Sequence, residues 1–532
     1  MNKKSLFSIA IVGLLTLGYS KASAQPGTLD NSLNLTGTEY FNIDSRCQAN
    51  TSALTAGGHI LVGGFSNSAV GSHSRYTLIN LFPDGRIDTT FAHLGMAIDS
   101  FPNSQRDIIK SVLVQPDGKI IALGSTDTGY TSMIPFISMM RYKANGEPDS
   151  TFGTNGKALF HFGGPTVGNS MAIQPDGKFV IAGSLSGKFM AARINANGTV
   201  DSSFWYVGFR TISIGNGPYD VAKAIALYPD GRILIAGASY NSTNYYASLV
   251  RLASNGIMDN TFGGVGIVTS LIYRHYDVIN SLQIQPDGKI IAAGTALISS
   301  TGSSPNNELF VVRYDTVGNE DVTFGITGIL NLNTGPYDDK CNSSLLLPDG
   351  KIMVGGYTTN SSYNPNYVLY RINTDGTPDA TFGTSGMVTT NFSIFGNNFL
   401  DYGACLNRQT DGKIVFSGYS SFSGTSIFTI ARYIMDGTLG AIDFSNNNTL
   451  LVYPNPIGNE LNLSFDLNKD ETIKIDLYDI TGRLNASLQP GKEMGAGNHH
   501  VSLQVPESLP KGEYFIVLQS GQGQRLYVKV VR

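Results

Sequence analysis

Arginine and aspartate residues recur at a fixed separation along the chain. An Arg is followed eight residues later by an Asp in five places, which are Arg141 with Asp149, Arg193 with Asp201, Arg251 with Asp259, Arg313 with Asp321, and Arg371 with Asp379. Such a row of paired charges could form a ligand-binding ring or could anchor loops between repeated units. Because a structural ion pair recurs wherever a fold repeats, we favour the structural interpretation.

Residues suited to metal, cofactor or nucleophilic chemistry do not fall into known patterns. Seven histidines are present, at positions 59, 73, 93, 161, 275, 499 and 500, and none has the His-Glu-x-x-His spacing of a zinc site. No Gly-x-Ser-x-Gly elbow, phosphate-binding glycine loop or dinucleotide motif occurs. The many Asp-Gly pairs, as in Asn373 to Gly376 followed by Asp379, resemble calcium loops, but hairpin turns need the same residues. We therefore predict no catalytic residue, no cofactor and no metal.

Tyrosines gather in long polar connections between apolar segments. These connections are rich in Ser and Asn, and the tyrosines in them are Tyr130, Tyr240, Tyr245, Tyr246, Tyr357, Tyr363 and Tyr367. Equivalent connections in a repeat protein project from one face, and tyrosine suits contact with a glycan or a protein. We treat these residues as a possible ligand face, and solvated loops without a ligand are the alternative.

The elements that would position these residues come from a repeat of about 60 residues. Its clearest part is Gln-Pro-Asp-Gly-Lys at 115–119, with exact or variant copies whose turn glycines are Gly58, Gly118, Gly177, Gly231, Gly288, Gly350 and Gly412. Their separations are 60, 59, 54, 57, 62 and 62 residues. Proline presets the first turn position and glycine accepts a left-handed one, so each copy predicts a β-hairpin.

The second half of the repeat adds two more strands. Apolar residues such as Phe310–Val312 precede each Arg, and residues such as Lys157–Phe160 follow the last glycine. Four short antiparallel strands in each of seven repeats predict an all-β, seven-bladed β-propeller, in which ring closure removes exposed sheet edges. The Phe residues of this half-repeat, at 91, 152, 204, 262, 324 and 382, are expected to pack between blades.

The two ends of the repeat region complement each other. Residues 27–33 match the second half-repeat at 198–204, whereas the last repeat has Gly440 where an Asp is expected eight residues after Arg432. We predict that Asp30 fills that position and pairs with Arg432, so that the ring closes through its ends. A separation beyond ~10 Å, which excludes direct pairing, would contradict this prediction.

The repeat resembles the delta-60 repeat family. The resemblance rests on the alternation of Gln-Pro-Asp-Gly-Lys with Arg-Tyr, Asn-Gly and Asp-Ser-Thr-Phe-Gly over residues 27–445. It implies a propeller without an assigned catalytic activity. Val317 precedes Gly318 where Asp or Asn is expected, and Ala92 and Trp205 stand where the family has Gly, so the local loop shape is expected to differ there.

A different domain follows the polar linker 443–449. Alternating strands are expected at 461–466, 473–478, 513–519 and 526–531, and they predict a small β-sandwich. The motifs Tyr453-Pro-Asn-Pro456, Leu477 to Arg483, and Leu509 to Tyr514 occur in this order. This motif order resembles the type A sorting domain of the type IX secretion system. The resemblance implies a member of the Bacteroidota, passage across the outer membrane, and release or attachment at the cell surface.

Composition and the N-terminus agree with export. Lys3 and Lys4, the apolar run 6–17 and the small residues 22–24 predict a signal peptide over 1–24. The apolar run is shorter than the ~20 residues of a membrane span, and we expect none elsewhere. A formal net charge of −4 argues against nucleic-acid binding. Three cysteines exclude a disulfide framework, and we expect free structural thiols, with Cys405 buried.

The expected domains are the signal peptide at 1–24, the propeller at 25–445 and the sorting domain at 446–532. We expect a secreted or cell-surface binding or scaffold protein rather than an enzyme, with the type IX machinery and a glycan or protein ligand as partners. The alternative is a secreted propeller enzyme acting on polysaccharide, which would need two carboxyl groups ~5 to 10 Å apart in a pocket.

Overall fold

The chain forms two compact units, one within residues 25–436 and one within residues 437–532. The computed structural model describes residues 25–34, 36–67, 73–128, 135–217, 219–273, 275–299, 306–332, 337–394, 397–435, 451–454, 456–467, 470–479, 484–520 and 525–532. The expected signal peptide and the expected domain boundary at 445 lie outside these residues. Within the described ranges, no helix has the length and apolar character needed to cross a membrane.

The first unit consists of sets of four antiparallel strands. Its first three sets are β2 (Arg46–Leu54), β3 (Ile60–Asn67), β4 (Ser74–Leu81) and β5 (Met96–Asp99); β6 (Ser104–Val114), β7 (Ile120–Thr128), β8 (Pro135–Tyr142) and β9 (Lys157–Phe160); and β10 (Thr166–Ile173), β11 (Phe179–Leu185), β12 (Lys188–Ile194) and β13 (Phe209–Ile212). The predicted four-stranded antiparallel pattern is confirmed.

The same pattern continues along the chain. The next sets are β14 (Val221–Leu227), β15 (Ile233–Tyr240), β16 (Tyr245–Leu252) and β17 (Ile267–Ser270); β18 (Tyr276–Ile284), β19 (Ile290–Ser299), β20 (Asn306–Tyr314) and β21 (Ile329–Leu332); and β22 (Asp339–Leu346), β23 (Ile352–Thr359), β24 (Pro365–Ile372) and β25 (Met387–Thr390). Two short elements lie in the connections between strands. They are a hairpin of β26 (Ser393–Ile394) and β27 (Asn397–Asn398), and a 3-10 turn η1 (Phe204–Tyr206).

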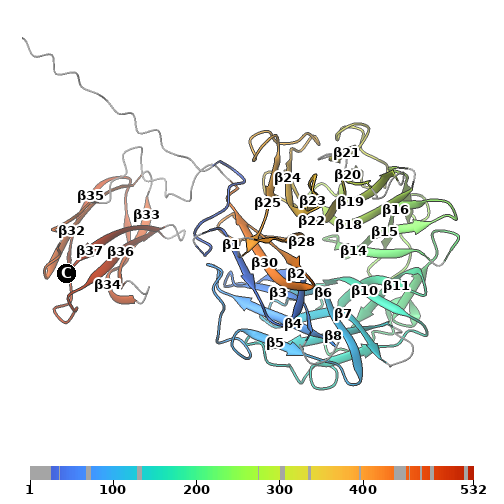
Figure 1. Ribbon diagram of the computed structural model, residues 1–532, viewed down its shortest axis with the longest axis horizontal. Coiled ribbons are helices and arrows are strands. Elements are labelled where there is room, and N and C mark those ends of the chain that lie inside the picture. The colour runs from blue at the N-terminus through green and yellow to red at the C-terminus, as the bar shows by residue number, and fades with distance from the viewer. Residues whose placement is uncertain are drawn as a thin grey trace, which may run out of the picture. The chain divides into compact units, whose positions relative to one another are not determined.

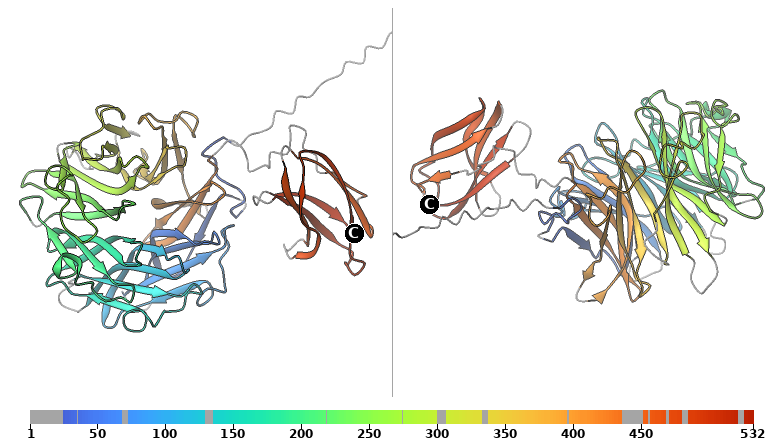
Figure 2. Two further views of the ribbon diagram at one scale, coloured as in Figure 1. Left: turned by 180° about the vertical axis from the view of Figure 1, so that it is seen from behind. Right: turned by 90° about the horizontal axis from the view of Figure 1, so that it is seen from above.

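The last set joins the two ends of the unit. It contains β28 (Leu400–Arg408), β29 (Ile414–Phe422), β30 (Thr425–Tyr433) and, from the beginning of the chain, β1 (Thr38–Phe41). Arg432 Nε donates to Asp30 Oδ2 at 2.7 Å, as predicted for the closing pair. Figure 1 and the left panel of Figure 2 show the sets following one another around a central axis.

The hairpins form where the sequence predicts them. Every turn glycine of the Pro-Asp-Gly copies has a positive φ, between 78° and 87°. In a representative turn, the amide of Gly118 donates to the carbonyl of Gln115 at 2.9 Å. The glycine therefore supplies the left-handed residue that reverses the chain between the first and second strands of each set.

Apolar side chains hold neighbouring sets together. The six repeated Phe side chains are at most 2% exposed, and each ring lies against a glycine of the following repeat. Phe152, for example, lies against Gly198, and Phe382 lies against Gly27 of the N-terminal segment. The prediction that these rings pack between repeats is confirmed, and a side chain at these glycines would collide with the rings.

The second unit contains two antiparallel sheets. One has the order β31 (Leu451–Tyr453), β32 (Glu460–Leu467), β35 (Gly497–Gln504), and the other has the order β34 (Leu484–Met494), β33 (Glu471–Asp479), β36 (Glu513–Ser520), β37 (Arg525–Val531). Buried residues from both sheets, including Leu463, Ile475 and Ile516, share one hydrophobic core. The alternating apolar pattern of these strands is thus explained by one buried face on each sheet.

Candidate ligand-binding surfaces

The repeated Arg–Asp pairs are structural contacts within each set of strands, and their arginines also bond to the next set. The Nε–Oδ2 distances in the five predicted pairs lie between 2.7 and 2.9 Å. Each guanidinium also donates to a backbone carbonyl of the next repeat; Arg141 contacts Ala196 O at 2.5 Å and Arg193 contacts Ser254 O at 2.7 Å. All these arginines are at most 7% exposed, so their donors are used inside the protein and are not available to a ligand.

The first repeat uses a different pair in the same place. Asn80 stands where the other repeats have Arg, and its amide donates to Asp88 at 3.0 Å. The ring of His59 lies 3.3 Å from the same carboxylate. His59 therefore partly replaces the missing guanidinium beside Asp88. The sequence pattern did not predict this role.

Two of the predicted tyrosines form part of a contiguous aromatic surface. Tyr240 and Tyr245 lie 4.8 Å apart between ring centroids, Tyr219 lies 5.5 Å from Tyr240, and Tyr276 lies 4.6 Å from Tyr245. We call these four residues the tyrosine cluster. Tyr219 is 56% exposed, so the cluster reaches solvent, while Tyr246 beside it accepts a hydrogen bond from Asn241 at 2.9 Å. The sequence prediction missed Tyr219 and Tyr276 because they belong to the neighbouring connection and strand.

The other predicted tyrosines do not join this cluster. Tyr363 is exposed and contacts Tyr337 at 5.4 Å, and Tyr130 lies outside the described residues. Tyr367 is fully buried, its ring packs against Phe416 at 4.7 Å, and its hydroxyl contacts Thr429 at 2.9 Å. Its assignment to a ligand face is therefore wrong: it lies within β24, on a face that packs against the last set of strands.

Tyr357 lines a cavity at the centre of the first unit. This cavity has a volume of about 660 Å³ and is lined mainly by the first strands of the sets, which are β2, β6, β10, β14, β18, β22 and β28. We call it the central channel. Tyr357 and Tyr402 lie 5.1 Å apart in it, and Tyr402 stacks on Tyr419 at 4.9 Å. A second cavity of about 490 Å³ shares Asn50 and Lys110 with the channel and includes Arg46 and Arg106.

A β-bulge interrupts the first strand of each set where it faces the channel. The extra residues, which we call the bulge residues, are Asn50, Lys110, Asn169, Lys223, Asn280, Asn342 and Ala404. Each stands eight residues before a turn glycine, so the sequence contained the signal. The pattern went unnoticed because a bulge shifts the alternation of side chains that identifies a strand face.

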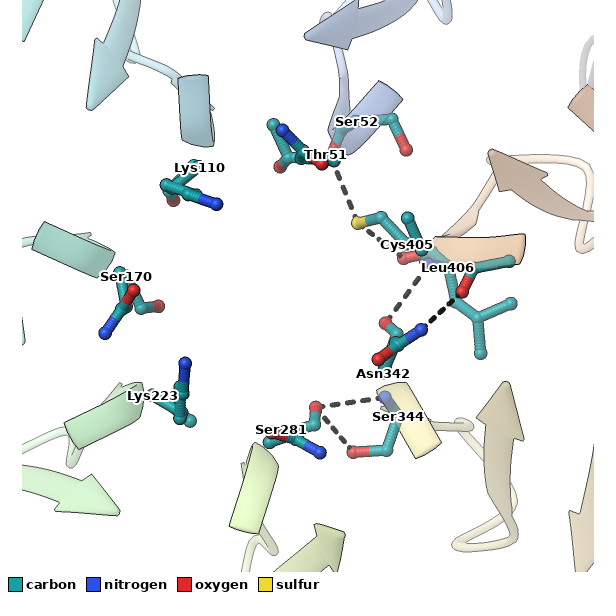
Figure 3. A pocket seen from close by; sticks show the side chains of 18 of the residues that line it. Thr51, Ser52, Lys110, Ser170, Lys223, Ser281, Asn342, Ser344, Cys405 and Leu406 are labelled. Carbon is teal, nitrogen blue, oxygen red and sulfur yellow. Dashed lines mark hydrogen bonds between the residues drawn. The ribbon is translucent and has the colours of Figure 1, made fainter. Parts of the chain in front are cut away.

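Most bulge residues bridge neighbouring sets. The amides of Asn50, Asn169, Asn280 and Asn342 each donate to the carbonyl before the next bulge residue, at 2.7 to 2.9 Å. Beside Ala404, the thiol of Cys405 lies 3.5 Å from the carbonyl of Ser52, and Figure 3 shows this contact across from Lys110, Ser170 and Lys223. Cys405 is half-buried and lines the channel, so the prediction that it is simply a buried apolar residue is wrong; all three cysteines are free, as predicted.

Buried carboxyl groups lie away from the channel. Asp277 accepts backbone hydrogen bonds from Ile272 at 2.7 Å and Tyr273 at 3.0 Å, and Asp401 accepts one from Phe392 at 2.8 Å. Burial raises the pKa of both carboxyl groups to about 7. Both side chains are fully buried, and no Asp or Glu is found among the described residues lining either cavity. These carboxyl groups hold loop backbone rather than facing a substrate.

Metal-ligating side chains do not converge in the described part of the chain. No group of three or more His, Cys, Asp or Glu residues there has an arrangement that could hold a metal ion. The Asp379 carboxylate, which the sequence placed beside a calcium-like Asn-Thr-Asp-Gly turn, binds Arg371 at 2.7 Å and Lys351 at 2.8 Å. The Asp379 carboxylate is therefore used in ion pairs of the fold.

Two family models match the chain, one in each unit. A model described as a domain of unknown function (DUF5122) beta-propeller matches residues 115–152, 174–204, 229–262, 285–324, 347–382 and 409–439. A model described as a secretion system C-terminal sorting domain matches residues 451–531. No curated protein matches the chain.

Solved structures resemble the chain only distantly. Sqt1 from Chaetomium thermophilum is 12% identical with a TM-score of 0.40, and the match covers 74% of this chain and 98% of that chain. The polysaccharide lyase Uly1 is 10% identical with a TM-score of 0.43, covering 79% and 94%. An α-L-arabinanase from Penicillium chrysogenum is 9% identical with a TM-score of 0.36, covering 74% and 94%.

Proposed function

Because the chain carries DUF5122 β-propeller repeats and a secretion system C-terminal sorting domain, we propose that it is a non-catalytic binding protein exported by the type IX secretion system. In this proposal the sets of strands are the seven blades of a propeller over residues 25–445. The two sheets of the second unit form a β-sandwich that directs export, so the mature protein is released or held at the cell surface.

The placement of the carboxyl groups carries the non-catalytic part of the proposal. Hydrolysis of a glycosidic bond generally uses two carboxyl groups ~5 to 10 Å apart on either side of the substrate. The carboxyl groups with a pKa near 7, Asp277 and Asp401, are instead buried and accept backbone hydrogen bonds. Raised pKa values at these positions follow from burial in the fold and do not require a catalytic role.

The tyrosine cluster is the proposed contact surface for a glycan or a protein. Its four rings form a continuous series with centroid distances of 4.6 to 5.5 Å. Aromatic rings offer large contact areas at small cost in side-chain entropy, and their hydroxyl groups can bond to a polar partner. The exposed Tyr363 and the channel residue Tyr357 are additional proposed contacts, each in a separate place.

Binding and hydrolysis can be tested together on the full-length chain. We expect binding to a subset of immobilised glycans or surface proteins, without release of sugars. The variant Tyr240→Ala/Tyr245→Ala should weaken that binding about tenfold or more, because it removes two adjacent anchor rings. Tyr206→Ala is the matched control, since Tyr206 is 81% exposed and lies in the connection at the opposite end of the strands. Release of sugars from polysaccharide would instead support an enzyme.

Export is tested by removing the second unit. A chain truncated after residue 445 should accumulate inside the outer membrane, while the full-length chain reaches the medium or the cell surface. Protease accessibility on intact cells distinguishes these locations. If the truncated chain reached the surface as efficiently as the full-length chain, the proposed role of residues 446–532 would be wrong.

A further inference from the structure

Six of the seven bulge residues fall into two classes at the wall of the central channel, and the seventh is Ala404. Four are asparagines whose amides bridge neighbouring sets, but the equivalent positions on β6 and β14 hold Lys110 and Lys223. By register, an asparagine at these two positions would face the carbonyls of Gly168 and Ile279, which precede the next bulge residues. At two places the chain thus has a cation where its repeat supplies a bridging amide.

These lysines lie in an environment without compensating negative charge. Lys110, Lys223 and Lys340 all line the channel, and no Asp or Glu lines its described wall. Of the carboxylates near the two cavities, Asp127 lies opposite Arg106 in the β6–β7 pairing, and Asp338 accepts a hydrogen bond from Tyr357 at 3.1 Å. Half-buried ammonium groups without a partner are unfavourable unless something neutralises them.

Mutual repulsion between these groups supports the same conclusion. Burial lowers the pKa of Lys223, and the charges of Lys110 and Lys340 lower it further. Burial likewise lowers the pKa of Lys110, with a contribution from Arg106. The positive groups are therefore close enough to repel one another, and an anion between them would relieve that repulsion.

The wall of the channel can also complete the coordination of an anion. Ser170 lies between Lys110 and Lys223 in Figure 3. A hydroxyl group of this kind donates a hydrogen bond to a carboxylate or phosphate oxygen. The volume of about 660 Å³ falls within the range of small-molecule sites.

We propose that the central channel binds a compact anion with two or more negative charges, a polycarboxylate or a phosphorylated small molecule, through Lys110, Lys223 and Lys340. The proposal rests on the binding function proposed above and names a ligand class for it. The channel lysines and the tyrosine cluster involve different residues. Anion binding in the channel and ligand binding at the tyrosine cluster can therefore be lost separately. Absence of the first alone contradicts this inference, and absence of the second contradicts the binding proposal.

Calorimetry and thermal unfolding of the full-length chain test the proposal with two probes, citrate and pyrophosphate. Sodium chloride at the same ionic strength is the control, because it screens charges to the same extent as each probe. We expect at least one probe to bind the wild-type chain and to raise its Tm with concentration, because a ligand of the native state stabilises it. The probe that binds more tightly identifies carboxylate or phosphate as the preferred group.

Substitution by the repeat's own bridging residue provides the sharpest variant. Lys110→Asn/Lys223→Asn should keep the fold and its ligand-free Tm, while affinity falls about tenfold or more per lysine removed. Lys110→Met/Lys223→Met is a second variant that keeps the length of the stem and removes only the charge. Lys188→Asn, at an exposed position on β12, is the control and should bind as the wild type does.

Two results would overturn the proposal. One is that neither citrate nor pyrophosphate binds the wild-type chain at concentrations up to ~10 mM. A dissociation constant above that concentration would be weaker than that of most small-molecule sites. The other is that a folded double variant of either kind binds both probes as tightly as the wild type.

Discussion

The outer Arg–Asp pairs and the lysines of the central channel place positive charge inside the same fold in opposite ways. Arg251 is 1% exposed, but its guanidinium contacts Asp259, Thr261 and a backbone carbonyl of the next repeat. Lys110 and Lys223 are half-buried, line a cavity and lie near other cations. The Arg–Asp pairs recur in each repeat because they stabilise it. Lys110 and Lys223 instead replace asparagines that bridge neighbouring sets, and this replacement indicates a ligand-binding site.

The largest effect is expected from breaking the closing pair. Asp30→Ala leaves the guanidinium of Arg432, which is 4% exposed, without its carboxylate. Removing one partner of a buried ion pair costs ~3 to 5 kcal/mol, so urea unfolding should show a loss of that order. Asp84→Ala removes an exposed pair with Arg86 and should change stability by less than ~1 kcal/mol. Equal losses in the two variants would show that the closing pair has no special importance.

A pH titration compares carboxyl groups with and without a neighbouring cation. Burial opposes ionisation of Asp259, but hydrogen bonds from Thr261 and the charge of Arg251 lower its pKa to about 2, whereas burial raises the pKa of Asp277 and Asp401 to about 7. The raised groups bind more protons in the folded state than in the unfolded state. Their stabilising contribution is complete below pH ~4 and is lost as the pH rises through about 7.

The variant Asp277→Asn/Asp401→Asn should reduce this pH dependence. An amide oxygen still accepts the backbone hydrogen bonds but does not ionise. Denaturant unfolding at several pH values between 4 and 8 would then show a smaller loss of stability than in the wild type. Asp287→Asn, in an exposed turn, should leave the wild-type profile unchanged. An unchanged profile in the double variant would mean that these carboxyl groups do not titrate in this range.

Converting a bridging asparagine into a fourth channel lysine would sharpen the comparison. Asn169→Lys removes the bond from the Asn169 amide to the carbonyl of Ala222 and adds charge between Lys110 and Lys223. The variant should lose about 1 kcal/mol of stability without ligand, the usual contribution of one hydrogen bond. Its affinity for the tighter of citrate and pyrophosphate should rise. Lower affinity, together with lower stability, would argue against a site organised by the bulge residues.

The smallest effect on stability is expected at Ala92, which replaces a repeated glycine and lies in a loop that we regard as unrelated to binding. Ala92 has φ 44° where equivalent repeats have Gly153, Gly263, Gly325 and Gly383 with φ between 53° and 56°. Ala92→Gly should raise the free energy of unfolding by ~0.5 to 1 kcal/mol, because a left-handed conformation is strained for alanine. Anion and glycan binding should not change. A binding change would show that this loop also contributes to ligand recognition.

The sequence predicted contacts that are encoded by fixed spacing. The hairpin turns at Gly118 and its equivalents, the Arg–Asp pairs and the closure by Asp30 all follow from residues at constant separations, and the structure confirms them. The candidate site was harder to predict, because Tyr367 resembles its neighbours in sequence but points into the core. Lys110 and Lys223 were missed although they stand at a constant distance from the turn glycines, because the register shift in each first strand disguises which side chains face the channel.

Closure of the first unit through its ends also constrains how it folds. Asp30 and Arg432 are 402 residues apart, and β1 pairs with β30 although nearly the whole unit separates them along the chain. Contacts at such separation form slowly because a long loop must close first. Strand β1 therefore has no partner until β30 has formed. Until then the edges that β1 and β30 present to each other are unpaired. Chaperone protection during export would be most needed in that interval.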